Sequence, residues 1–197
     1  MKTKVVLSWL GGAIGVVAAL GAYAALETGV KAPDFSAKAA LNGKEFTYSL
    51  ADNLKKGPVV VYFYPSAYTG GCNLQAHTFS TKTDQFAAAG ASIVGVSLDD
   101  IGRLKDFSSD PEYCAGKIPV ASDADGSIAK SYGLKVGDAN PAAKDTRGVQ
   151  IKHGFAERTT FIVNKDGTIA ATVGGVSPVD NVNEALAAVQ KLSGAKK

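Results

Sequence analysis

The chain of 197 residues is poor in the residues that hold metal ions or form disulfide frameworks. It has two cysteines, Cys72 and Cys114, and two histidines, His77 and His153. Neither cysteine lies at the spacing of a zinc site, and the histidines are not grouped with carboxylates, so we expect no bound metal. The chain also lacks a C-x-x-C pair, the motif of thioredoxin-like thiol–disulfide oxidoreductases.

An excess of charge is missing too. The formal net charge is +3, and Lys2 and Lys4 alone account for two of these positive charges. The rest of the chain has 19 basic and 18 acidic residues, a nearly balanced charge, so we expect no nucleic-acid partner. The glycine pairs Gly70-Gly71 and Gly174-Gly175 match no phosphate-binding fingerprint, and we expect no cofactor. The hydrophobic share of 46% and the charged share of 20% are those of a globular protein.

The longest hydrophobic run lies at the N-terminus. Residues 1–4 are basic, Val5–Leu26 carries no charge, and Ala22-Tyr23-Ala24 has the small residues of a signal peptidase site. The run is also long enough to span a membrane, so residues 1–26 are interpreted either as a cleaved signal peptide or as an anchor through residues 5–26. Lysines before the run place the N-terminus in the cytoplasm. Both interpretations predict that residues 27–197 form an exported, periplasmic domain.

A cysteine lies where a predicted strand, turn and helix meet. The unbroken apolar run Val59–Phe63 predicts a strand that is buried on both faces. Proline and glycine residues end this strand, and a helix-compatible run continues from Cys72 to about Ala89. The start of a helix offers unpaired N–H groups and the positive end of the helix dipole, and both stabilise a thiolate. The pattern therefore predicts a nucleophilic cysteine.

The rest of the domain alternates strands with helices, which predicts an α/β fold with a central sheet and parallel pairs joined by crossovers. Asn42-Gly43 is a hairpin signal, and a second hairpin is expected at 159–173. The predicted strands are 37–41, 45–50, 91–98, 118–122, 159–163 and 168–173. The predicted helices are 101–107, 127–132 and 178–192. Residues 136–155 show no period and predict a long loop.

The two cysteines allow a structural interpretation. In an exported domain they could form a disulfide that closes a loop of roughly 40 residues and stabilises the fold by about 3–4 kcal/mol. A structural disulfide, however, needs neither the proline-to-glycine turn before Cys72 nor a helix start. Counting cysteines leaves both interpretations open.

Two motifs carry a resemblance to a known family. Pro65-Ser66-Ala67-Tyr68-Thr69-Gly70-Gly71-Cys72 fits P-x-x-x-[TS]-x-x-C, and Arg158-Thr159-Thr160-Phe161 is similar to an R-[ST]-[ST]-F strand. Together with Ala32-Pro33-Asp34-Phe35 and Ala121-Ser122-Asp123, they resemble the peroxiredoxins, most of all the Q-type, bacterioferritin comigratory protein-like group. The resemblance covers Val30 to Leu192. It implies a thioredoxin-like fold, a central mixed sheet flanked by helices.

The resemblance also implies an activity and a set of site residues. It implies a thiol peroxidase that reduces hydrogen peroxide and organic hydroperoxides and is re-reduced by an external thiol, as a monomer or dimer. Cys72 would be the peroxidatic cysteine, which becomes a sulfenic acid. Thr69 would hydrogen-bond the peroxide, Pro65 would shield the thiolate, and Arg158 would hold both thiolate and peroxide. Cys114 would be the resolving cysteine of an intramolecular disulfide.

The chain departs from the family pattern at two places. Q-type relatives often carry the resolving cysteine five residues after the first, where this chain has His77, which we interpret as a helix-surface residue. Other relatives place it in the following crossover helix; Cys114 lies near the end of that region, and a spare thiol is the alternative. Gly70 replaces a proline found in many relatives. Two other functions stay open: a thioredoxin-like thiol–disulfide oxidoreductase, and a non-catalytic thioredoxin-like module with a structural disulfide.

Overall fold

The computed structural model describes residues 24–194. Nearly all of the expected signal peptide at residues 1–26, or of the alternative anchor through residues 5–26, therefore lies outside the described residues. Between residues 24 and 194, no helix has both the length and the hydrophobicity that crossing a membrane requires.

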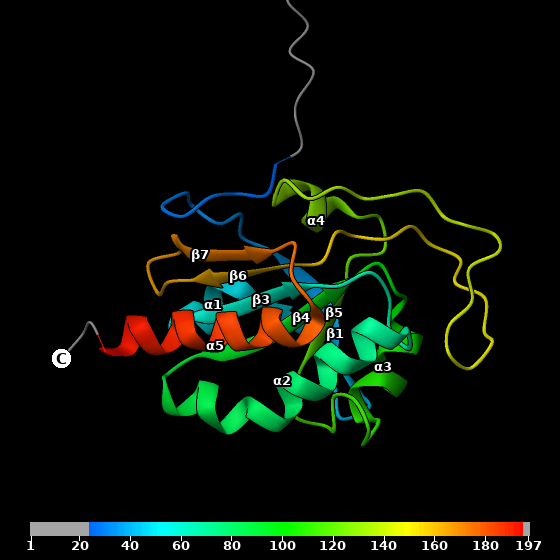
Figure 1. The fold of residues 1–197 in the computed structure, drawn as a ribbon, viewed down its shortest axis with the longest axis horizontal. Coiled ribbons are helices and arrows are strands. Elements are labelled where there is room, and N and C mark those ends of the chain that lie inside the picture. Colours follow the sequence, from blue (N-terminus) through cyan, green and yellow to red (C-terminus); the bar gives the residue numbers. More distant parts are fainter. Residues whose placement is uncertain (1–23, 195–197) are drawn as a thin grey trace, which may run out of the picture.

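The described part of the chain is built on one sheet of seven strands in the order β2-β1-β5-β4-β3-β6-β7 (Figure 1). The strands are β1 (Ser36–Leu41), β2 (Lys44–Ser49), β3 (Val59–Phe63), β4 (Ser92–Ser97), β5 (Val120–Ser122), β6 (Thr159–Val163) and β7 (Ile169–Gly174). The pairs β3–β4 and β4–β5 are parallel, and the other four pairs are antiparallel. The predicted mixed sheet is confirmed, and antiparallel pairing extends beyond its hairpins to β1–β5 and β3–β6.

Within residues 24–194, five helices flank this sheet: α1 (Leu50–Leu54), α2 (Gly70–Ala88), α3 (Ile101–Ser109), α4 (Ser127–Ser131) and α5 (Pro178–Gly194). Helices α2, α3 and α5 cover one face, and α1 and α4 cover the other (Figure 1). Four of these helices were predicted as helices or as helix-capable runs, and the single turn α1 was not. Ser49 begins that turn by accepting a hydrogen bond from the Asp52 N–H group at 3.2 Å, as an N-cap does.

Strand β3 is buried on both faces, which accounts for its run of aliphatic and aromatic residues. Its alternating side chains enter two separate cores: Val60 and Tyr62 pack under α2, α3 and α5, whereas Val59, Val61 and Phe63 pack under α1 and α4. All five are buried, as the unbroken apolar run predicted. Cys72 and Cys114 both belong to the core under α2, α3 and α5.

Turns and loops follow the sequence signals closely. Asn42 and Gly43 have φ values of 49° and 75°, as expected for a two-residue hairpin turn. Strand β5 is shorter than predicted and begins after Pro119, which has no N–H group to donate to a neighbouring strand. Residues 136–155 contain no strand or helix and run along one side of the molecule (Figure 1).

Candidate active site

Cys72 is the third residue of α2 and is only 2% exposed. Thr69 is the N-cap residue of this helix, with an extended backbone at φ −104° and ψ 146°. Its hydroxyl does not cap the helix but donates to the carbonyl oxygen of Ser66 at 2.9 Å. Within the described residues, α2 thus begins with neither a side-chain cap nor an acidic residue in its first turn, and its positive end stabilises negative charge on the Cys72 sulfur.

Arg158 provides the second positive group at this sulfur. Its Nη2 atom donates to Sγ of Cys72 at 3.4 Å. Arg158 immediately precedes β6. The antiparallel pairing of Phe63 with Thr159 places it at the C-terminal end of β3, where the active-site loop (residues 64–69) begins. Gly71 leaves room for it, because a Cβ atom there would lie 3.1 Å from Arg158 Nη2. The structure thus brings together the two residues that the sequence motifs placed 86 positions apart.

A polar relay that sequence reasoning missed orients Arg158. Arg158 Nη1 donates to the side-chain oxygen of Gln75, and Gln75 Nε2 donates to Oδ1 of Asn181 at 2.8 Å. The same Asn181 oxygen accepts from the Thr160 hydroxyl at 2.6 Å, while Asn181 Nδ2 donates to the Val173 carbonyl at 3.0 Å. Gln75, Asn181 and Thr160 are each 0% exposed. Every polar end of the two amides has a partner, which fixes how Gln75 faces Arg158.

Two signals in the sequence could have found this relay. Gln75 lies three positions after Cys72, so both residues face the same side of α2. Asn181 lies four positions before Ala185, within the apolar stripe of α5 that faces the sheet. A polar residue in a buried stripe needs a polar partner, because an unpaired buried amide is costly.

The second cysteine is buried beside the active-site loop but is not bonded to Cys72. Cys114 is 0% exposed, and both cysteines are free thiols. Burial, with a smaller effect of the nearby Asp110 charge, raises the pKa of the Cys114 thiol far above its usual value. The flanking residue Tyr113 packs against Tyr68, with ring centroids 5.7 Å apart. Cys114 thus lies in a segment that packs on the loop leading to Cys72, and its thiol is protonated there.

The remaining predicted residues are placed as follows. Pro65 is half-buried, two positions after the end of β3. His77 is exposed on α2, as interpreted from the sequence, and its Nδ1 lies 2.9 Å from the carbonyl oxygen of Glu112. Within residues 24–194, no three histidine, cysteine or acidic side chains gather closely enough to hold a metal ion.

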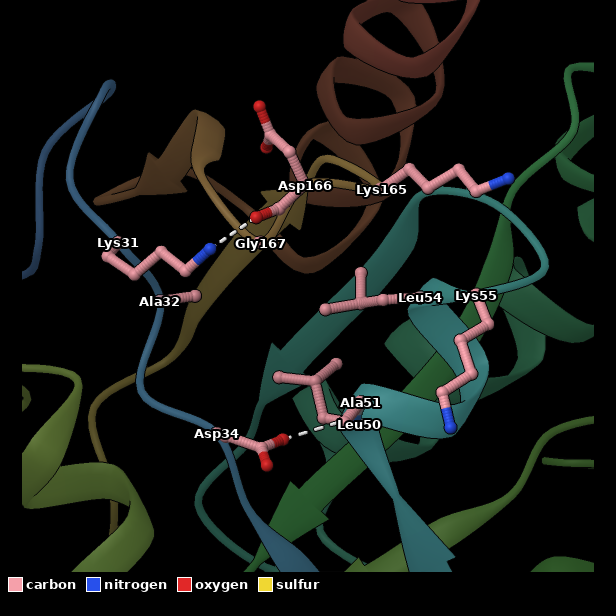
Figure 2. A pocket seen from close by; sticks show the side chains of 10 residues that line it. All are labelled: Lys31, Ala32, Asp34, Leu50, Ala51, Leu54, Lys55, Lys165, Asp166 and Gly167. Atoms are coloured by element: carbon pink, nitrogen blue, oxygen red, sulfur yellow. Dashed lines mark hydrogen bonds between the residues drawn. The ribbon is translucent and has the colours of Figure 1, made fainter.

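A cavity of about 410 Å³ lies away from this site. It is lined by Ala32, Leu50 and Leu54, with Lys31 donating to the backbone oxygen of Asp166 at its rim (Figure 2). The turn that contributes Asp166 follows β6, whereas Arg158 precedes that strand, so the cavity lies at the opposite end of the sheet from Cys72. It contains no cysteine and no histidine.

Comparisons with a family model, with related sequences and with solved structures all relate the chain to peroxiredoxins. Residues 28–172 match the AhpC/TSA family. The chain is 32% identical over 146 residues to the bcp peroxiredoxin of Coxiella burnetii, covering 74% of this chain and 87% of that protein. It is 30% identical over 174 residues to the chloroplastic 2-Cys peroxiredoxin BAS1 of Hordeum vulgare, covering 86% and 76%. Among solved structures, peroxidoxin BcpB of Mycobacterium tuberculosis superposes with a TM-score of 0.68 at 27% identity, over 85% of this chain and 98% of that chain.

Proposed function

Because the chain belongs to the AhpC/TSA family, we propose that Cys72 is its peroxide-reducing nucleophile. The chain is a peroxiredoxin of the Q-type, bcp-like group. It has the thioredoxin-like fold and is a thiol-dependent peroxidase. The observation that carries this assignment is the environment of one sulfur atom. Cys72 Sγ lies at the uncapped N-terminus of α2 and accepts a hydrogen bond from Arg158. Both groups favour the thiolate, the form of cysteine that attacks peroxides.

The reaction follows from this arrangement. The Cys72 thiolate attacks one oxygen of the peroxide; an S–O bond forms as the O–O bond breaks, and the departing oxygen takes up a proton to leave as water or an alcohol. Arg158 stays beside the reacting atoms and stabilises the negative charge that moves from sulfur to the departing oxygen. The Thr69 hydroxyl already donates to Ser66, so its oxygen lone pairs are free to accept a hydrogen bond from the peroxide O–H group. Pro65 shields the thiolate from water.

Substitution of Cys72 tests the nucleophile. Reduced wild-type protein mixed with one equivalent of hydrogen peroxide should consume it, as followed by a residual-peroxide assay, and Cys72→Ser should leave the peroxide intact. Cys114→Ser is the matched control, because it removes a buried thiol yet leaves Cys72 in place, and it should complete one turnover. Consumption by Cys72→Ser at the wild-type rate would refute the assignment.

Cys114 is the proposed resolving cysteine. Its sulfur attacks the sulfur of the Cys72 sulfenic acid; the S–S bond forms as the S–O bond breaks, and water leaves. Support comes from the packing of its neighbour Tyr113 on Tyr68. Both sulfurs are buried and Cys114 is held as a neutral thiol, so its segment must move before it reacts. An external thiol reductant then restores both thiols.

The disulfide can be detected directly. After one equivalent of peroxide, mass spectrometry of the non-reduced, digested monomer should show a peptide pair joined through Cys72 and Cys114. A persistent sulfenic or sulfinic acid at Cys72 with Cys114 still free would instead assign a one-cysteine enzyme with a spare thiol.

The site of action is proposed to be the periplasm. The basic residues 1–4 followed by a charge-free run to Leu26 support export of residues 27–197, either after signal cleavage or on a membrane anchor. Intact mass of the protein isolated from its native host distinguishes these two, because cleavage removes the N-terminal segment. Recovery from the cytoplasmic fraction would contradict export.

A further inference from the structure

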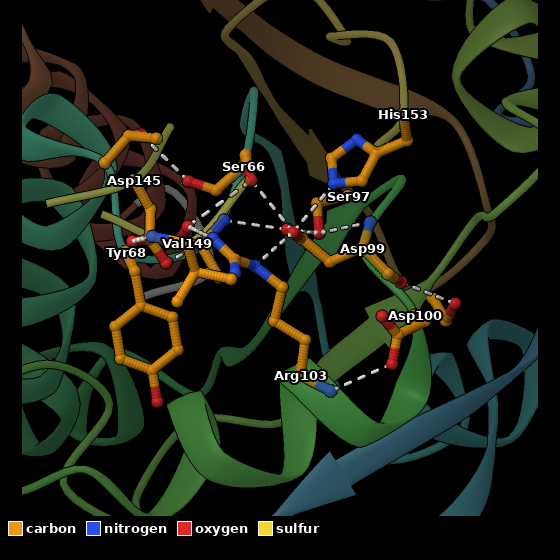
Figure 3. A network of polar contacts seen from close by, with 12 residues as sticks. Ser66, Tyr68, Ser97, Asp99, Asp100, Arg103, Asp145, Val149 and His153 are labelled. Atoms are coloured by element: carbon orange, nitrogen blue, oxygen red, sulfur yellow. Dashed lines mark hydrogen bonds and ion pairs between the residues drawn. The ribbon is translucent and has the colours of Figure 1, made fainter. Parts of the chain in front are cut away.

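A buried cluster of charged side chains lies beside the active-site loop, residues 64–69, and has no role in the reaction described above (Figure 3). Its centre is Arg103, which forms ion pairs with Asp99 at 2.8 Å and with Asp145 at 3.0 Å. The side chains of both aspartates are 0% exposed, and that of Arg103 is 11% exposed. Arg147 adds a second ion pair to Asp145 at 2.8 Å, and His153 adds one to Asp99 at 2.8 Å. These five residues are called the charge cluster below.

The charge cluster makes hydrogen bonds to both backbone polar groups of Ala67, a residue of the active-site loop. Asp99 accepts a hydrogen bond from the Ala67 N–H group at 2.7 Å. Arg103 donates to the Ala67 carbonyl oxygen at 2.6 Å. Asp99 also accepts from the Ser66 hydroxyl at 2.8 Å. The backbone between Pro65 and Thr69 is therefore fixed by side chains that come from outside the loop.

The next residue, Tyr68, has a backbone conformation that is unfavourable for a residue with a side chain. Its φ is 60°, in the left-handed region where a residue with a Cβ atom is strained. The Tyr68 carbonyl accepts from both the N–H and the hydroxyl of Thr146 at 2.9 Å each. The guanidinium of Arg147, which Asp145 holds, lies 3.2 Å from the centre of the Tyr68 ring. A strained backbone persists only where its surroundings determine it, and here the surroundings are the charge cluster and the 136–155 loop.

Stability alone does not account for such a cluster. Placing carboxylates and guanidinium groups in an apolar interior costs desolvation energy that their mutual attraction barely offsets, and apolar residues of similar size often stabilise a fold as well. What the charged groups add is direction, because each hydrogen bond has one geometry. Here the hydrogen bonds converge on Ser66 and Ala67, immediately before Tyr68 and within six residues of Cys72.

We propose that Asp99 and Asp145 are positioning residues for peroxide reduction. Asp99 binds Ala67 directly, and Asp145 orients Arg103 and Arg147, so that Ala67 and Tyr68 keep the conformation that places Thr69 and the start of α2 for attack. Neither aspartate touches the peroxide. Without them Tyr68 relaxes toward negative φ, which turns Thr69 away and opens the loop over Cys72. This inference rests on the assignment of Cys72 as the nucleophile.

Two rates measured on the same protein test the proposal. In the full chain carrying Cys114→Ser, Asp99→Asn and Asp145→Asn keep the side-chain size and remove the charge. Each should slow the reaction of Cys72 with hydrogen peroxide by about 10- to 100-fold, since misplacement on the order of 1 Å costs about that much. Each should also speed alkylation of Cys72 by iodoacetamide, read by intact mass, because the opened loop admits a reagent that needs no positioned Thr69.

Asp123→Asn is the matched control. Asp123 is 2% exposed and accepts hydrogen bonds from the N–H groups of Ile128 and Ala129, so it is a buried carboxylate that does not contact the active-site loop. Its loss should lower stability and leave both rates unchanged. The proposal is overturned if folded Asp99→Asn and Asp145→Asn react with peroxide within twofold of the parent, or if Asp123→Asn slows the reaction as much as they do.

A variant at the edge of the cluster covers the case in which the aspartate variants do not fold. Arg147 is 41% exposed, and Arg147→Gln removes the guanidinium from the Tyr68 ring without leaving a buried charge at its own position. It should show the same slower peroxide reaction and faster alkylation, and unchanged rates would overturn the proposal. Cys72→Ser distinguishes failure of the proposed function from failure of this inference. Peroxide consumption by Cys72→Ser refutes the assignment of Cys72 as the nucleophile, whereas normal rates in the cluster variants refute only the positioning role.

Discussion

At the scale of single residues, the site depends on how closely an arginine approaches a helix N-terminus. The Arg158 guanidinium makes hydrogen bonds to both Cys72 and Gln75, and its planar fork of donors allows this, whereas the single ammonium of a lysine would not hold both in one orientation. The approach is possible because residue 71 has no side chain. A Cβ atom there would lie 3.1 Å from Arg158 Nη2 and 3.4 Å from Pro178 Cγ.

Gly71→Ala should therefore separate activity from stability. Alanine favours a helix over glycine by roughly 0.5–1 kcal/mol, so the free energy of unfolding should not fall by more than the small strain at Pro178. The displaced arginine should slow the reaction with peroxide by roughly tenfold, as expected for a weakened charged hydrogen bond of about 1.5 kcal/mol. Urea unfolding and the rate of peroxide consumption measure the two effects.

Gly70→Ala is the control for that prediction. A Cβ atom at Gly70 would have no neighbour within 4 Å, so this variant gains the same helix preference without touching Arg158. It should be as active as the wild type. Equal activity of the two alanine variants would show that the approach of Arg158 to residue 71 does not limit the reaction.

At the scale of elements, the site is made where the ends of β3 and β6 meet the first turns of α2 and α5. Antiparallel pairing of β3 with β6 sets Arg158 opposite the active-site loop, and α5 packs against both α2 and β6. Asn181 in the first turn of α5 is the point where these elements exchange hydrogen bonds. Helix α5 thus contacts the polar relay behind Arg158 through the Asn181 amide.

Asn181→Leu should lower both stability and activity. Leucine leaves the Gln75 amide, the Thr160 hydroxyl and the Val173 carbonyl without partners, and each unpaired buried group costs about 1–3 kcal/mol. The free energy of unfolding should fall by at least about 2 kcal/mol, and the reaction with peroxide should slow because Gln75 is free to turn away from Arg158. Asn183 is exposed on the same helix and accepts a hydrogen bond from Lys82 at 2.6 Å, outside the relay. Asn183→Leu should leave the reaction with peroxide unchanged and lower the free energy of unfolding by less than Asn181→Leu; effects as large there would contradict a role for the relay.

The sequence predicted the elements well and the polar connections poorly. β3, α2 and the β6–β7 hairpin were predictable because their periodicity, turn residues and apolar runs are local signals. Cys72, Thr69 and Arg158 were predicted because they lie in motifs. Asp99 could be placed only at the end of β4. Its contact with His153 depends on the aperiodic 136–155 loop, whose path is set by tertiary contacts rather than by any local pattern.

At the scale of the whole molecule, the charge cluster connects that loop to the body of the domain. His153 lies in the loop, and Asp99 follows β4 at the centre of the sheet. Burial alone would lower the pKa of His153, but the Asp99 carboxylate overcomes it and raises that pKa above its usual value. Burial alone would raise the pKa of Asp99, but hydrogen bonds from His153 and the Ala67 N–H group hold it below its usual value. The contact is therefore an ion pair over the pH range between these two titrations.

This ion pair makes stability depend on pH in a defined direction. The folded-state pKa of His153 is raised, so its contribution is complete below the unfolded value of about 6.5 and is lost as the pH rises through the folded pKa. The folded-state pKa of Asp99 is lowered, so its contribution is present above about 3.9 and is lost as the pH falls through its folded pKa. His153→Gln should thus reduce the free energy of unfolding by on the order of 1–3 kcal/mol at pH 6. The deficit should shrink as the pH rises through the folded-state pKa of His153, where the wild-type imidazole loses its charge.

Urea unfolding of both proteins across this pH range gives the difference directly. His77→Gln is the reference, because His77 is exposed and its recorded partner is a backbone carbonyl rather than a carboxylate. Its difference from the wild type gives the cost of replacing an exposed imidazole. A His153→Gln deficit that does not change between pH 6 and pH 9 would mean that the His153–Asp99 contact works as a neutral hydrogen bond, and that the loop is held to the domain by Asp145 and its two arginines.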